Sequence, residues 1–573
     1  GDQNFFSDSR STMQAADALV VVVDAVDGVK VQTEEAWDFA DELGLPRVIF
    51  INKLDRDRSD FARAFNDVEN TFIPKPIILQ LPIGKEADFN GVVDLIDMKA
   101  YQYDDSGKAT AIDIPMDMKD QVDSERESLI ENIAEADDAL LERYLEGEEI
   151  KEDEMKSALK KGVLSRTFVP VLCGTATKNV GIDLLCDFVV NCLPSPAERG
   201  DFIGTDASDE NEVVRNADPD APFSALVFKT ITDPYAGQLS IFRVISGTLG
   251  SDGTFYNIKT GAKERYAQLH RLAGKEQKPV NDAGPGAIVA VAKLKDTHTG
   301  DTLCHEGSPV KFKSADPLPP LITFALEAKK EGEEDKIVSA LSKVLNEDVA
   351  LKLTRNSETK EILLSGRGEI HIETTIEKLR RKFNVETLLN PPKVPYRETI
   401  KKKVKVQGRH KKQSGGHGQF GDCWIQMEPL PRGQGFEFVD SIVGGVIPKT
   451  YIPAVEKGIV EAAKRGVLAG FPLVDFKVIL DDGSYHAVDS SEMAFKIAGS
   501  LAFKKAAQDA APTLLEPIMT VAITTPDEFM GDIMGDLNSR RGRVLGMDTK
   551  GKYQIINAQV PMSEFLTYAI ELR

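Results

Sequence analysis

The residues with the clearest chemical potential are Asn52, Lys53, Leu54 and Asp55, which follow an apolar run that ends at Ile51. A carboxylate in the place of Asp55 can accept two hydrogen bonds, from the ring N–H and the exocyclic amine of guanine. Asn52 can bind the acceptor edge of the base and tie neighbouring loops, while the Lys53 stem covers the ring face. Adenine would leave the buried carboxylate unpaired, so this pattern predicts a guanine-selective site.

The position of these four residues also suits ligand binding. A strand expected over 47–51 ends directly before them, and open parallel sheets bind ligands outside the carboxyl ends of their strands. Taken alone, the four residues leave a second interpretation open, a polar turn after a core strand.

A phosphate-binding loop is missing from the sequence. The pattern Gly-x-x-x-x-Gly-Lys-Ser/Thr, which cradles phosphates with backbone N–H groups and holds magnesium, occurs nowhere in the 573 residues. The chain begins at Gly1 and soon enters a helix expected over 7–16 and a strand over 19–24. We therefore expect a chain cut from a longer parent, which as given binds GTP weakly and is enzymatically inactive.

The charge of the chain is unevenly distributed. A formal net charge of −21 argues against a simple electrostatic coat for nucleic acid, because phosphate contact requires clustered Lys and Arg. The acidity concentrates in 104–154, whereas 401–412 is basic, and Arg540, Arg541 and Arg543 form a second basic cluster. Solvated faces are the alternative for each of these runs.

Cysteine usage and hydropathy indicate a reducing compartment and no membrane insertion. The five cysteines show no paired metal spacing, and no apolar stretch approaches bilayer length. These cysteines are Cys173, Cys186, Cys192, Cys304 and Cys423. We expect a cytoplasmic, monomeric protein.

The first 200 residues alternate strands and helices. Runs at 19–24, 47–51, 77–81 and 168–173 are apolar on both faces, as a covered parallel sheet requires. We expect 1–200 to form a P-loop-type α/β domain that lacks its phosphate-binding part. An acidic, helix-rich insertion at about 87–166, with helices over 118–144 and 152–164, interrupts it. Residues 201–222, rich in Pro, Asp, Asn and Gly, are expected to be a linker.

The rest of the chain predicts four further domains, so the fold class is multidomain α/β and α+β. Short β-patterned runs separated by glycine-containing turns predict a β-barrel over 223–312. The order β-α-β-β-α-β over 317–390 is that of a ferredoxin-like domain. Residues 400–515 combine strands with an alanine-rich helix at 493–510, in an α+β domain like those of ribosomal proteins. The ferredoxin-like order begins again at 516 and is incomplete at 573.

Several longer motifs occur together with the guanine-binding pattern, and in them the sequence closely resembles the elongation factor G family along essentially its whole length. The matching stretches are Asn52–Arg56, Cys173–Ala176 with Lys178 and Asn179, Asp233–Pro234, Phe242–Val244 with Ser246 and Gly247, Ser365–Glu369, Tyr396–Ile400, Gln413–Gly421, Gly483–Glu492 and Gly531–Arg541. So many motifs in one order are far more specific than any single one.

This resemblance implies a five-domain GTPase that moves tRNA and mRNA on the ribosome. Its ligand would be GTP or GDP with Mg²⁺, and its partners would be ribosomal RNA, the tRNA–mRNA duplex at the decoding centre and stalk proteins. Thr175 and Ala176 match a loop that contacts the guanine carbonyl through backbone N–H groups. Gly1 falls at the end of the family's Asp-Thr-Pro-Gly switch motif. The implied GTP-binding residues are Gly1, Asn52, Lys53, Asp55, Thr175 and Ala176.

One position departs from the family. Asp2 stands where the family has a histidine that orients the attacking water, so the catalytic residue stays unassigned. An additional negative charge beside the γ-phosphate opposes stabilisation of the transition state. Two interpretations stay open: impaired or differently triggered hydrolysis, and a merely divergent helix start.

Two loops of the fourth domain resemble the tip that enters the decoding centre. The RNA-facing residues implied by the resemblance are Gly415, Gly416, His417, Gly418, Gln419, His486 and Asp489. Flexible glycine loops with Gln and His donors suit duplex RNA, which is bound through its shape, backbone and 2′-OH groups. The adjacent basic run at 401–412 is then expected to contact phosphates. Solvent turns are the alternative.

Three functions share this resemblance. The first is a GTPase that drives translocation. The second is a paralogue that binds the ribosome with weak or altered GTP hydrolysis. The third is a ribosome-protection factor, which the loop 485–492 disfavours because it is so similar to elongation factor G.

Overall fold

The computed structural model describes residues 2–148, 150–206, 211–233, 237–274, 276–330, 332–413, 418–550 and 553–572. The chain forms two compact units. One contains 1–321, 328–353 and 365–387, and the other contains 322–327, 354–364 and 388–573.

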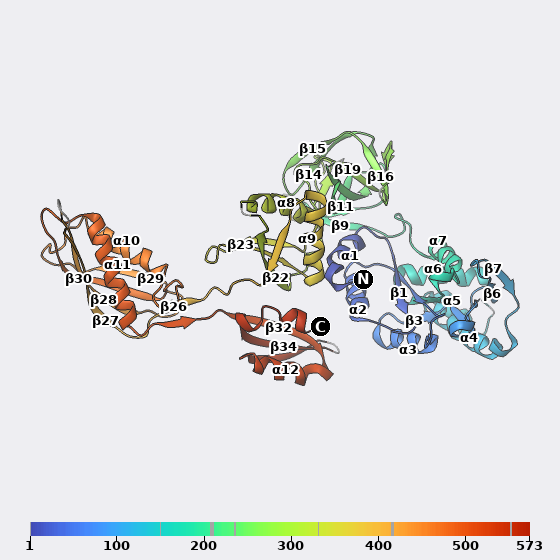
Figure 1. The fold of residues 1–573 in the computed structure, drawn as a ribbon. Helices are drawn as coiled ribbons and strands as arrows, with labels where there is room; N and C mark the ends of the chain where they lie inside the picture. The colour runs from blue at the N-terminus through green and yellow to red at the C-terminus, as the bar shows by residue number, and fades with distance from the viewer. Residues whose placement is uncertain are drawn as a thin grey trace. The chain divides into compact units, whose positions relative to one another are not determined.

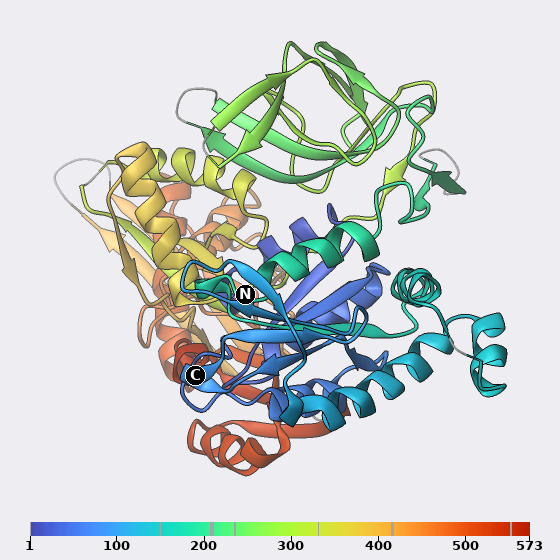
Figure 2. The ribbon, with the colours of Figure 1, turned by 90° about the vertical axis from the view of Figure 1, so that its right-hand side faces the viewer.

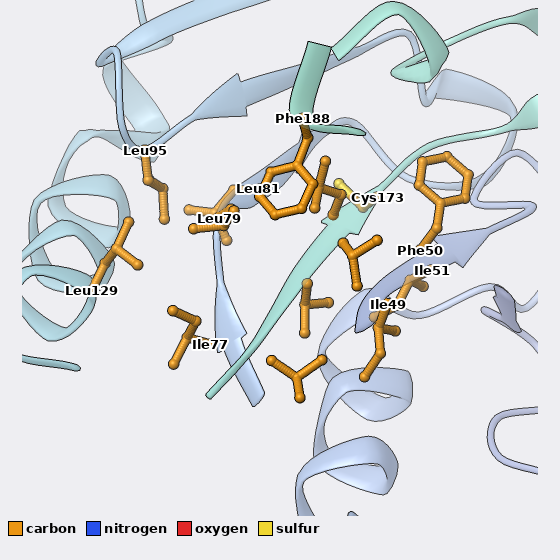
Figure 3. Close-up of a cluster of buried hydrophobic side chains, with 14 of the residues drawn as sticks. Ile49, Phe50, Ile51, Ile77, Leu79, Leu81, Leu95, Leu129, Cys173 and Phe188 are labelled. Atoms are coloured by element: carbon orange, nitrogen blue, oxygen red, sulfur yellow. The ribbon is translucent and has the colours of Figure 1, made fainter. Parts of the chain in front are cut away.

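The first unit begins with a parallel sheet. Its strands are β1 (Leu19–Asp24), β2 (Arg47–Asn52), β8 (Val169–Cys173) and β3 (Pro76–Ile78), in the order β1-β2-β8-β3. Strand β2 is buried along its length until Asn52. Figure 3 shows its side chains Ile49, Phe50 and Ile51 within one apolar cluster together with Cys173 of β8. The predicted α/β sheet is therefore confirmed, and the guanine-binding pattern follows the buried strand β2. The edge strand β1 is not covered on both faces as expected, because Val20 and Val22 are exposed.

Helices surround this sheet. A 3₁₀ turn, η1 (Gln3–Phe5), precedes α1 (Phe6–Met13), and α2 (Val31–Glu42), α3 (Phe61–Thr71) and α7 (Ile182–Cys192) follow. The helix expected over 7–16 thus ends earlier, because the N–H groups of Ala15 and Ala16 bond to carbonyls only three residues back. Trp37 of α2 stacks on Phe72 with 4.1 Å between the ring centroids.

The strand expected over 77–81 is two strands. β3 stays in the parallel sheet, whereas β4 (Gln80–Ile83) joins a second, antiparallel sheet with β5 (Gly91–Asp94), β6 (Lys99–Tyr103) and β7 (Ala109–Ile112). The insertion is therefore not only helical. Its strands have four or five residues, too few for a convincing alternation of apolar and polar positions.

Three helices complete the insertion: α4 (Lys119–Ala134), α5 (Asp138–Leu145) and α6 (Glu152–Ser165). A single helix was expected over 118–144. The chain breaks there because the side chain of Asp137 accepts a hydrogen bond of 3.1 Å from the N–H of Ala139, which starts a new helix.

The expected linker contains two strands, β9 (Phe202–Thr205) and β10 (Glu212–Arg215), which pair with each other, and β9 also pairs with β21 (Lys311–Phe312). The next domain is an eight-stranded antiparallel sheet that curls around its core, shown in green in Figure 2. Its order is β15 (Ala262–Tyr266), β14 (Gly253–Asn257), β20 (Thr302–Cys304), β11 (Ser224–Asp233), β12 (Gly237–Ser246), β19 (Ile288–Ala292), β16 (Leu269–Ala273) and β17 (Glu276–Val280). Two short strands that fall between these in chain order, β13 (Leu249–Gly250) and β18 (Asp282–Ala283), pair with each other.

The third segment has the predicted order of elements. Its elements are, in chain order, β22 (Ile322–Ala328), α8 (Glu334–Glu347), β23 (Lys352–Arg355), β24 (Ile362–Gly366), α9 (Glu369–Phe383) and β25 (Thr387–Asn390). The sheet order β23-β24-β22-β25 is that of a ferredoxin-like fold.

The fourth domain belongs to the second unit. Its sheet has the order β27 (Val404–Lys412), β28 (Gln419–Pro429), β30 (Phe476–Ser484) and β29 (Phe436–Asp440). Helices α10 (Ile452–Ala463) and α11 (Glu492–Asp509) lie side by side along it (Figure 1). They approach closely through glycine, since a Cβ on Gly458 would lie 2.0 Å from the carbonyl oxygen of Lys496. β26 (Arg397–Thr399) and β31 (Thr513–Leu515), which flank this domain in sequence, pair antiparallel.

The last segment contains β32 (Ile518–Pro526), α12 (Met530–Ser539), β33 (Arg543–Lys550), β34 (Tyr553–Pro561) and α13 (Tyr568–Glu571). Two arginines of the second basic cluster form ion pairs here, Arg540 with Glu571 at 2.6 Å and Arg541 with Glu516 at 2.6 Å. Their charges are therefore matched within the segment itself. Among the described residues, no helix is both long and apolar enough to cross a bilayer.

Candidate functional site

The loop after β2 is held in an uncommon backbone conformation. Lys53 has a φ of 66°, in the left-handed region that side chains other than glycine rarely adopt. The neighbouring Asn52 accepts a hydrogen bond of 2.9 Å through its Oδ1 from the backbone N–H of Ala176. The amide of Asn52 thus ties the two loops that the sequence analysis assigned to guanine. Such local strain is typical of binding sites whose surroundings hold it in place.

Asp55 faces the second loop. Its Oδ1 accepts a hydrogen bond of 2.6 Å from the hydroxyl of Thr175, and its Oδ2 lies 3.3 Å from the Nζ of Lys178. Burial acts to raise the pKa of Asp55, but these contacts with Thr175 and Lys178 outweigh it and hold the pKa below its ordinary value. The side chain is 15% exposed and ionised at neutral pH, so free lone pairs can still accept from a ligand.

The second loop follows β8 and requires glycine. A Cβ on Gly174 would lie 2.2 Å from the carbonyl oxygen of Val180 and 2.7 Å from the ring of Phe50. The N–H of Thr175 donates to the carbonyl of Val180 at 3.0 Å, which closes the loop. Both backbone N–H groups expected to contact guanine, those of Thr175 and Ala176, therefore have protein partners in this structure.

Asp24 is a residue of this site that the sequence analysis missed. It ends β1, and its Oδ2 lies 2.7 Å from the Nζ of Lys53 and 3.4 Å from Arg56. Burial acts to raise the pKa of Asp24, but the hydrogen bond from Lys53 and those from backbone N–H groups lower it overall. The sequence could have indicated Asp24, because this residue ends the apolar run of β1. Strands β1 and β2 are parallel neighbours, so their carboxyl ends meet at one edge of the sheet.

The side chains at this edge of the sheet fit a guanine base. Asp55 offers a partly exposed carboxylate, and Asn52 and Lys53 stand beside it at the carboxyl edge of the sheet. Within the described part of the chain, no group of three His, Cys, Asp or Glu side chains could hold a metal ion. The loops after β2 and β8 are therefore joined through Asn52 and Asp55.

Asp2 caps the first turn of the chain. Its Oδ1 accepts hydrogen bonds of 2.8 Å from both the backbone N–H and the side-chain amide of Asn4. Aspartate at this position is a favourable start for a helical turn. Gly1 lies outside the described residues.

The two loops of the fourth domain meet. Gly418 donates its backbone N–H to the Oδ1 of Asp489 at 3.0 Å, and Phe420 donates its N–H to the carbonyl of Asp489 at 2.8 Å. The ring of His486 lies 6.4 Å from that of Phe420 and is 56% exposed. Gln419 is also exposed. Gly415, Gly416 and His417 lie outside the described residues.

Part of the basic run beside these loops is paired. Lys405 lies 2.7 Å from Asp481, and Lys403 lies 3.0 Å from Glu428. Arg409 stands over the ring of Phe420 at 5.6 Å. The positive charge on β27 that could meet phosphates therefore concentrates toward the tip.

Comparison with known families accounts for nearly the whole chain. The matching models are described as the elongation factor Tu GTP binding domain over 1–195, elongation factor G domain 2 over 222–306, domain III over 318–391, domain IV over 392–511, and the elongation factor G C-terminus over 513–573.

A solved structure is similar over the same length. The crystal structure of a protein from Thermus thermophilus is 39% identical in sequence, with a TM-score of 0.81. The match covers 99% of this chain and 82% of that one. The order of the matched domains and this likeness together show that the chain belongs to the elongation factor G family, whose first domain has the fold of a translation elongation factor GTPase.

Proposed function

We propose that the protein is an elongation factor G-type GTPase that drives the movement of tRNA and mRNA on the ribosome, in the cytoplasm. The observation that carries this proposal is the tip of domain IV, where Gly418 and Phe420 of one loop bond to Asp489 of the other. Exposed Gln419 and His486 stand on this joined tip. A duplex of tRNA and mRNA is a fitting ligand, because such duplexes are bound through their shape and backbone.

The nucleotide-binding role rests on the loops after β2 and β8. In this proposal Asp55 accepts hydrogen bonds from guanine, Asn52 holds the second loop, and Lys53 covers the ring face. A GTP-bound Mg²⁺ would neutralise phosphate charge during hydrolysis. Adenine would leave the carboxylate of Asp55 without hydrogen-bond donors, and this cost makes the site selective for guanine.

A second candidate function is a ribosome-binding paralogue with weak or altered GTP hydrolysis. Asp2 favours it, because the carboxylate occupies the position of the family's switch histidine and already binds Asn4 at 2.8 Å. A negative group there does not offset the charge that develops on the transferred phosphoryl group.

GTP hydrolysis by the full-length protein, measured with and without ribosomes, separates the two candidates. Marked stimulation by ribosomes supports the translocase, and an unchanged rate supports the paralogue. The tip is tested in a tRNA translocation assay with the double variant Gln419→Ala, His486→Ala. We expect slower translocation, because both side chains are lost from the RNA-facing surface.

The same double variant needs a melting curve as its control. Exposed loop residues away from caps and cores usually shift stability by no more than about 0.5 kcal/mol. A lower translocation rate with an unchanged melting temperature therefore supports a direct role for the tip. Normal translocation by the double variant would contradict the translocase proposal.

A further inference from the structure

The loop after β8 is closed on itself by backbone hydrogen bonds. The N–H of Thr175 donates to the carbonyl of Val180 at 3.0 Å, and the N–H of Val180 donates to the carbonyl of Thr175 at 3.1 Å. Between them a 3₁₀ turn, η4 (Ala176–Lys178), leads to Asn179, whose φ of 57° lies in the left-handed region. Asn179 belongs to one of the matching stretches, but the site described above gives it no role.

The turn between β6 and β7 of the insertion, residues 104–108, packs against this loop. At Gly107, a Cβ would lie 2.6 Å from the Cβ of Asn179 and 2.9 Å from the carbonyl oxygen of Lys178. Glycine also suits the φ of 78° at this position. The backbone of this insertion turn therefore lies directly against the loop after β8, and only glycine allows so close an approach.

The insertion turn is held in place at its base. Tyr103 ends β6 and is 6% exposed, and its hydroxyl donates a hydrogen bond of 2.5 Å to the Oδ1 of Asp183, in the first turn of α7 (Figure 1). Burial, followed by the hydrogen bond to Asp183, raises the pKa of Tyr103, so the hydroxyl keeps its proton. Within the turn, Asp104 accepts the N–H groups of Ser106 and Lys108 at 2.9 and 3.0 Å. The insertion turn can therefore move away from the loop only by breaking these bonds.

A shift of Asn179 would reach the candidate guanine site through its neighbours. Asn179 directly follows Lys178, whose Nζ lies 3.3 Å from the Oδ2 of Asp55. Its N–H donates to the carbonyl of Ala176 at 3.3 Å, and the N–H of Ala176 in turn donates to the Oδ1 of Asn52 at 2.9 Å. The contact at Gly107 is thus connected to both loops of the site.

We propose that Gly107 and Tyr103 are positioning residues for the nucleotide: the insertion turn holds the loop after β8 in the place that guanine requires, so that affinity for GDP depends on the insertion. This inference rests on the proposed function, in which the loops after β2 and β8 bind guanine. Neither residue acts on the base itself, because both act through the loop.

The contact is tested with Gly107→Ala in the full-length protein, matched by Gly147→Ala in the same insertion. Both glycines have a φ of 78°, so alanine brings the same backbone strain, but a Cβ on Gly147 would meet open space among the described residues. We expect Gly107→Ala to bind a fluorescent GDP analogue about tenfold more weakly, because guanine then has to bring the loop back against the added methyl group. Gly147→Ala should stay within about twofold of wild type. Equal affinities of the two variants would overturn the proposal.

A second substitution separates this contact from a general loss of structure. Asn179→Gly removes the Cβ nearest to the added methyl group, and glycine readily adopts the φ of 57° found there. In the Asn179→Gly background, Gly107→Ala should weaken binding by only about threefold, since the carbonyl of Lys178 alone remains close. The full tenfold loss in that background would show that position 107 does not act through Asn179, and would overturn the proposal.

The anchor of the insertion turn is tested with Tyr103→Phe. This variant keeps the ring and removes the hydroxyl that donates to Asp183. We expect the GDP analogue to dissociate about fivefold faster, the loss of one hydrogen bond behind the loop. An unchanged dissociation rate would overturn the positioning role of Tyr103.

Hydrogen exchange without nucleotide separates this inference from the proposed function. The N–H groups of Thr175, Ala176 and Val180 are all bonded, and mass spectrometry of a peptide over 174–181 reports their protection. We expect faster exchange in Gly107→Ala than in Gly147→Ala. Equal exchange would overturn the inference even if wild type binds GDP tightly. Faster exchange in Gly107→Ala, together with a wild type that binds no GDP, would support the positioning of the loop and refute the nucleotide-binding role in the proposed function.

Discussion

Replacing Glu398 with glutamine should destabilise domain IV strongly, although the side chain keeps its shape. Glu398 belongs to β26 and is completely buried. Its Oε2 accepts the backbone N–H groups of Val467 at 2.6 Å and Leu468 at 3.0 Å. Its Oε1 accepts those of Ala469, Gly470 and Phe471, at 2.8, 3.1 and 3.2 Å. One carboxylate thus satisfies five consecutive N–H groups of a distant loop.

The size of the effect follows from this geometry. Glutamine retains one acceptor oxygen and places an NH₂ group where the second oxygen was. In either orientation of the amide, at least two backbone N–H groups then face a donor. Leaving a buried donor unsatisfied costs about 1–3 kcal/mol, so the expected loss is about 2–6 kcal/mol.

Fluorescence of Trp424 can follow this loss within the domain. The chain has two tryptophans, and Trp424 lies on β28 of domain IV. A Trp37→Phe background, used for both reference and variant, makes Trp424 the single reporter in a guanidinium titration. Glu437→Gln is the control, because it removes an exposed ion pair with Lys477 and should cost less than about 1 kcal/mol. A shift for Glu398→Gln no larger than that of the control would refute the reasoning.

The same carboxylate makes the stability of domain IV dependent on pH. Burial acts to raise the pKa of Glu398, but the backbone N–H groups, led by those of Val467 and Ala469, hold the pKa below its ordinary value. A group whose pKa is lower in the folded state stabilises fully above its unfolded pKa, and the contribution is lost as pH falls through the folded pKa. The stability difference between wild type and Glu398→Gln should therefore narrow below about pH 4.3. An unchanged difference down to pH 2 would show that Glu398 does not titrate in this way.

Three further predictions concern the nucleotide domain of the full-length protein. Asp55→Asn should weaken the preference for GTP over ATP by about 2–4 kcal/mol, because an amide donates where two acceptors are needed; an unchanged preference in competition binding means that Asp55 does not contact the base. Asp2→His should raise ribosome-stimulated GTP hydrolysis, since imidazole can orient water without a further negative charge; if wild type already hydrolyses as fast as the variant, Asp2 does not limit the rate. Gly174→Ala should weaken binding of a fluorescent GDP analogue by at least about tenfold. The added Cβ would lie 2.2 Å from the carbonyl oxygen of Val180 and would displace the loop that carries Ala176. Unchanged binding of the analogue would show that the loop adapts.

Local patterns were sufficient for the elements that carry the nucleotide loops. The apolar run before Asn52 corresponds to β2, because a strand buried on both faces leaves a continuous apolar signal. The run before Asp24 corresponds to β1, although Val20 and Val22 of this edge strand are exposed. The same rule did not separate β3 from β4. The chain passes from one sheet to another at Leu79, whose N–H donates to Val171 while its carbonyl accepts from Leu95. Apolar residues lie on both sides of this point, and buried Gln80 is the one polar residue among them from 76 to 83.

Local sequence patterns do not indicate which distant segments contact one another. Glu398 lies in a motif that the sequence analysis used only for resemblance, and its partners are backbone N–H groups about 70 positions away, which leave no trace in residue types. Asp489 has a partner, the N–H of Gly418, that was missed for a related reason. Its residue type and position are compatible with an RNA-facing role, and only the Gly418 N–H shows that the carboxylate is already used.

The pairing of β26 with β31 has a mechanical consequence. The partners are Arg397 with Leu515 and Thr399 with Thr513, so the chain enters and leaves domain IV at the same end of a two-stranded ribbon. A tension applied between the segments on either side pulls these two strands apart like a zipper, one pair after another, beginning at Arg397 and Leu515. Until the ribbon opens, the force bypasses the sheet and helices of domain IV. Single-molecule pulling across this point should therefore release a first, low-force extension before the rest of domain IV unfolds.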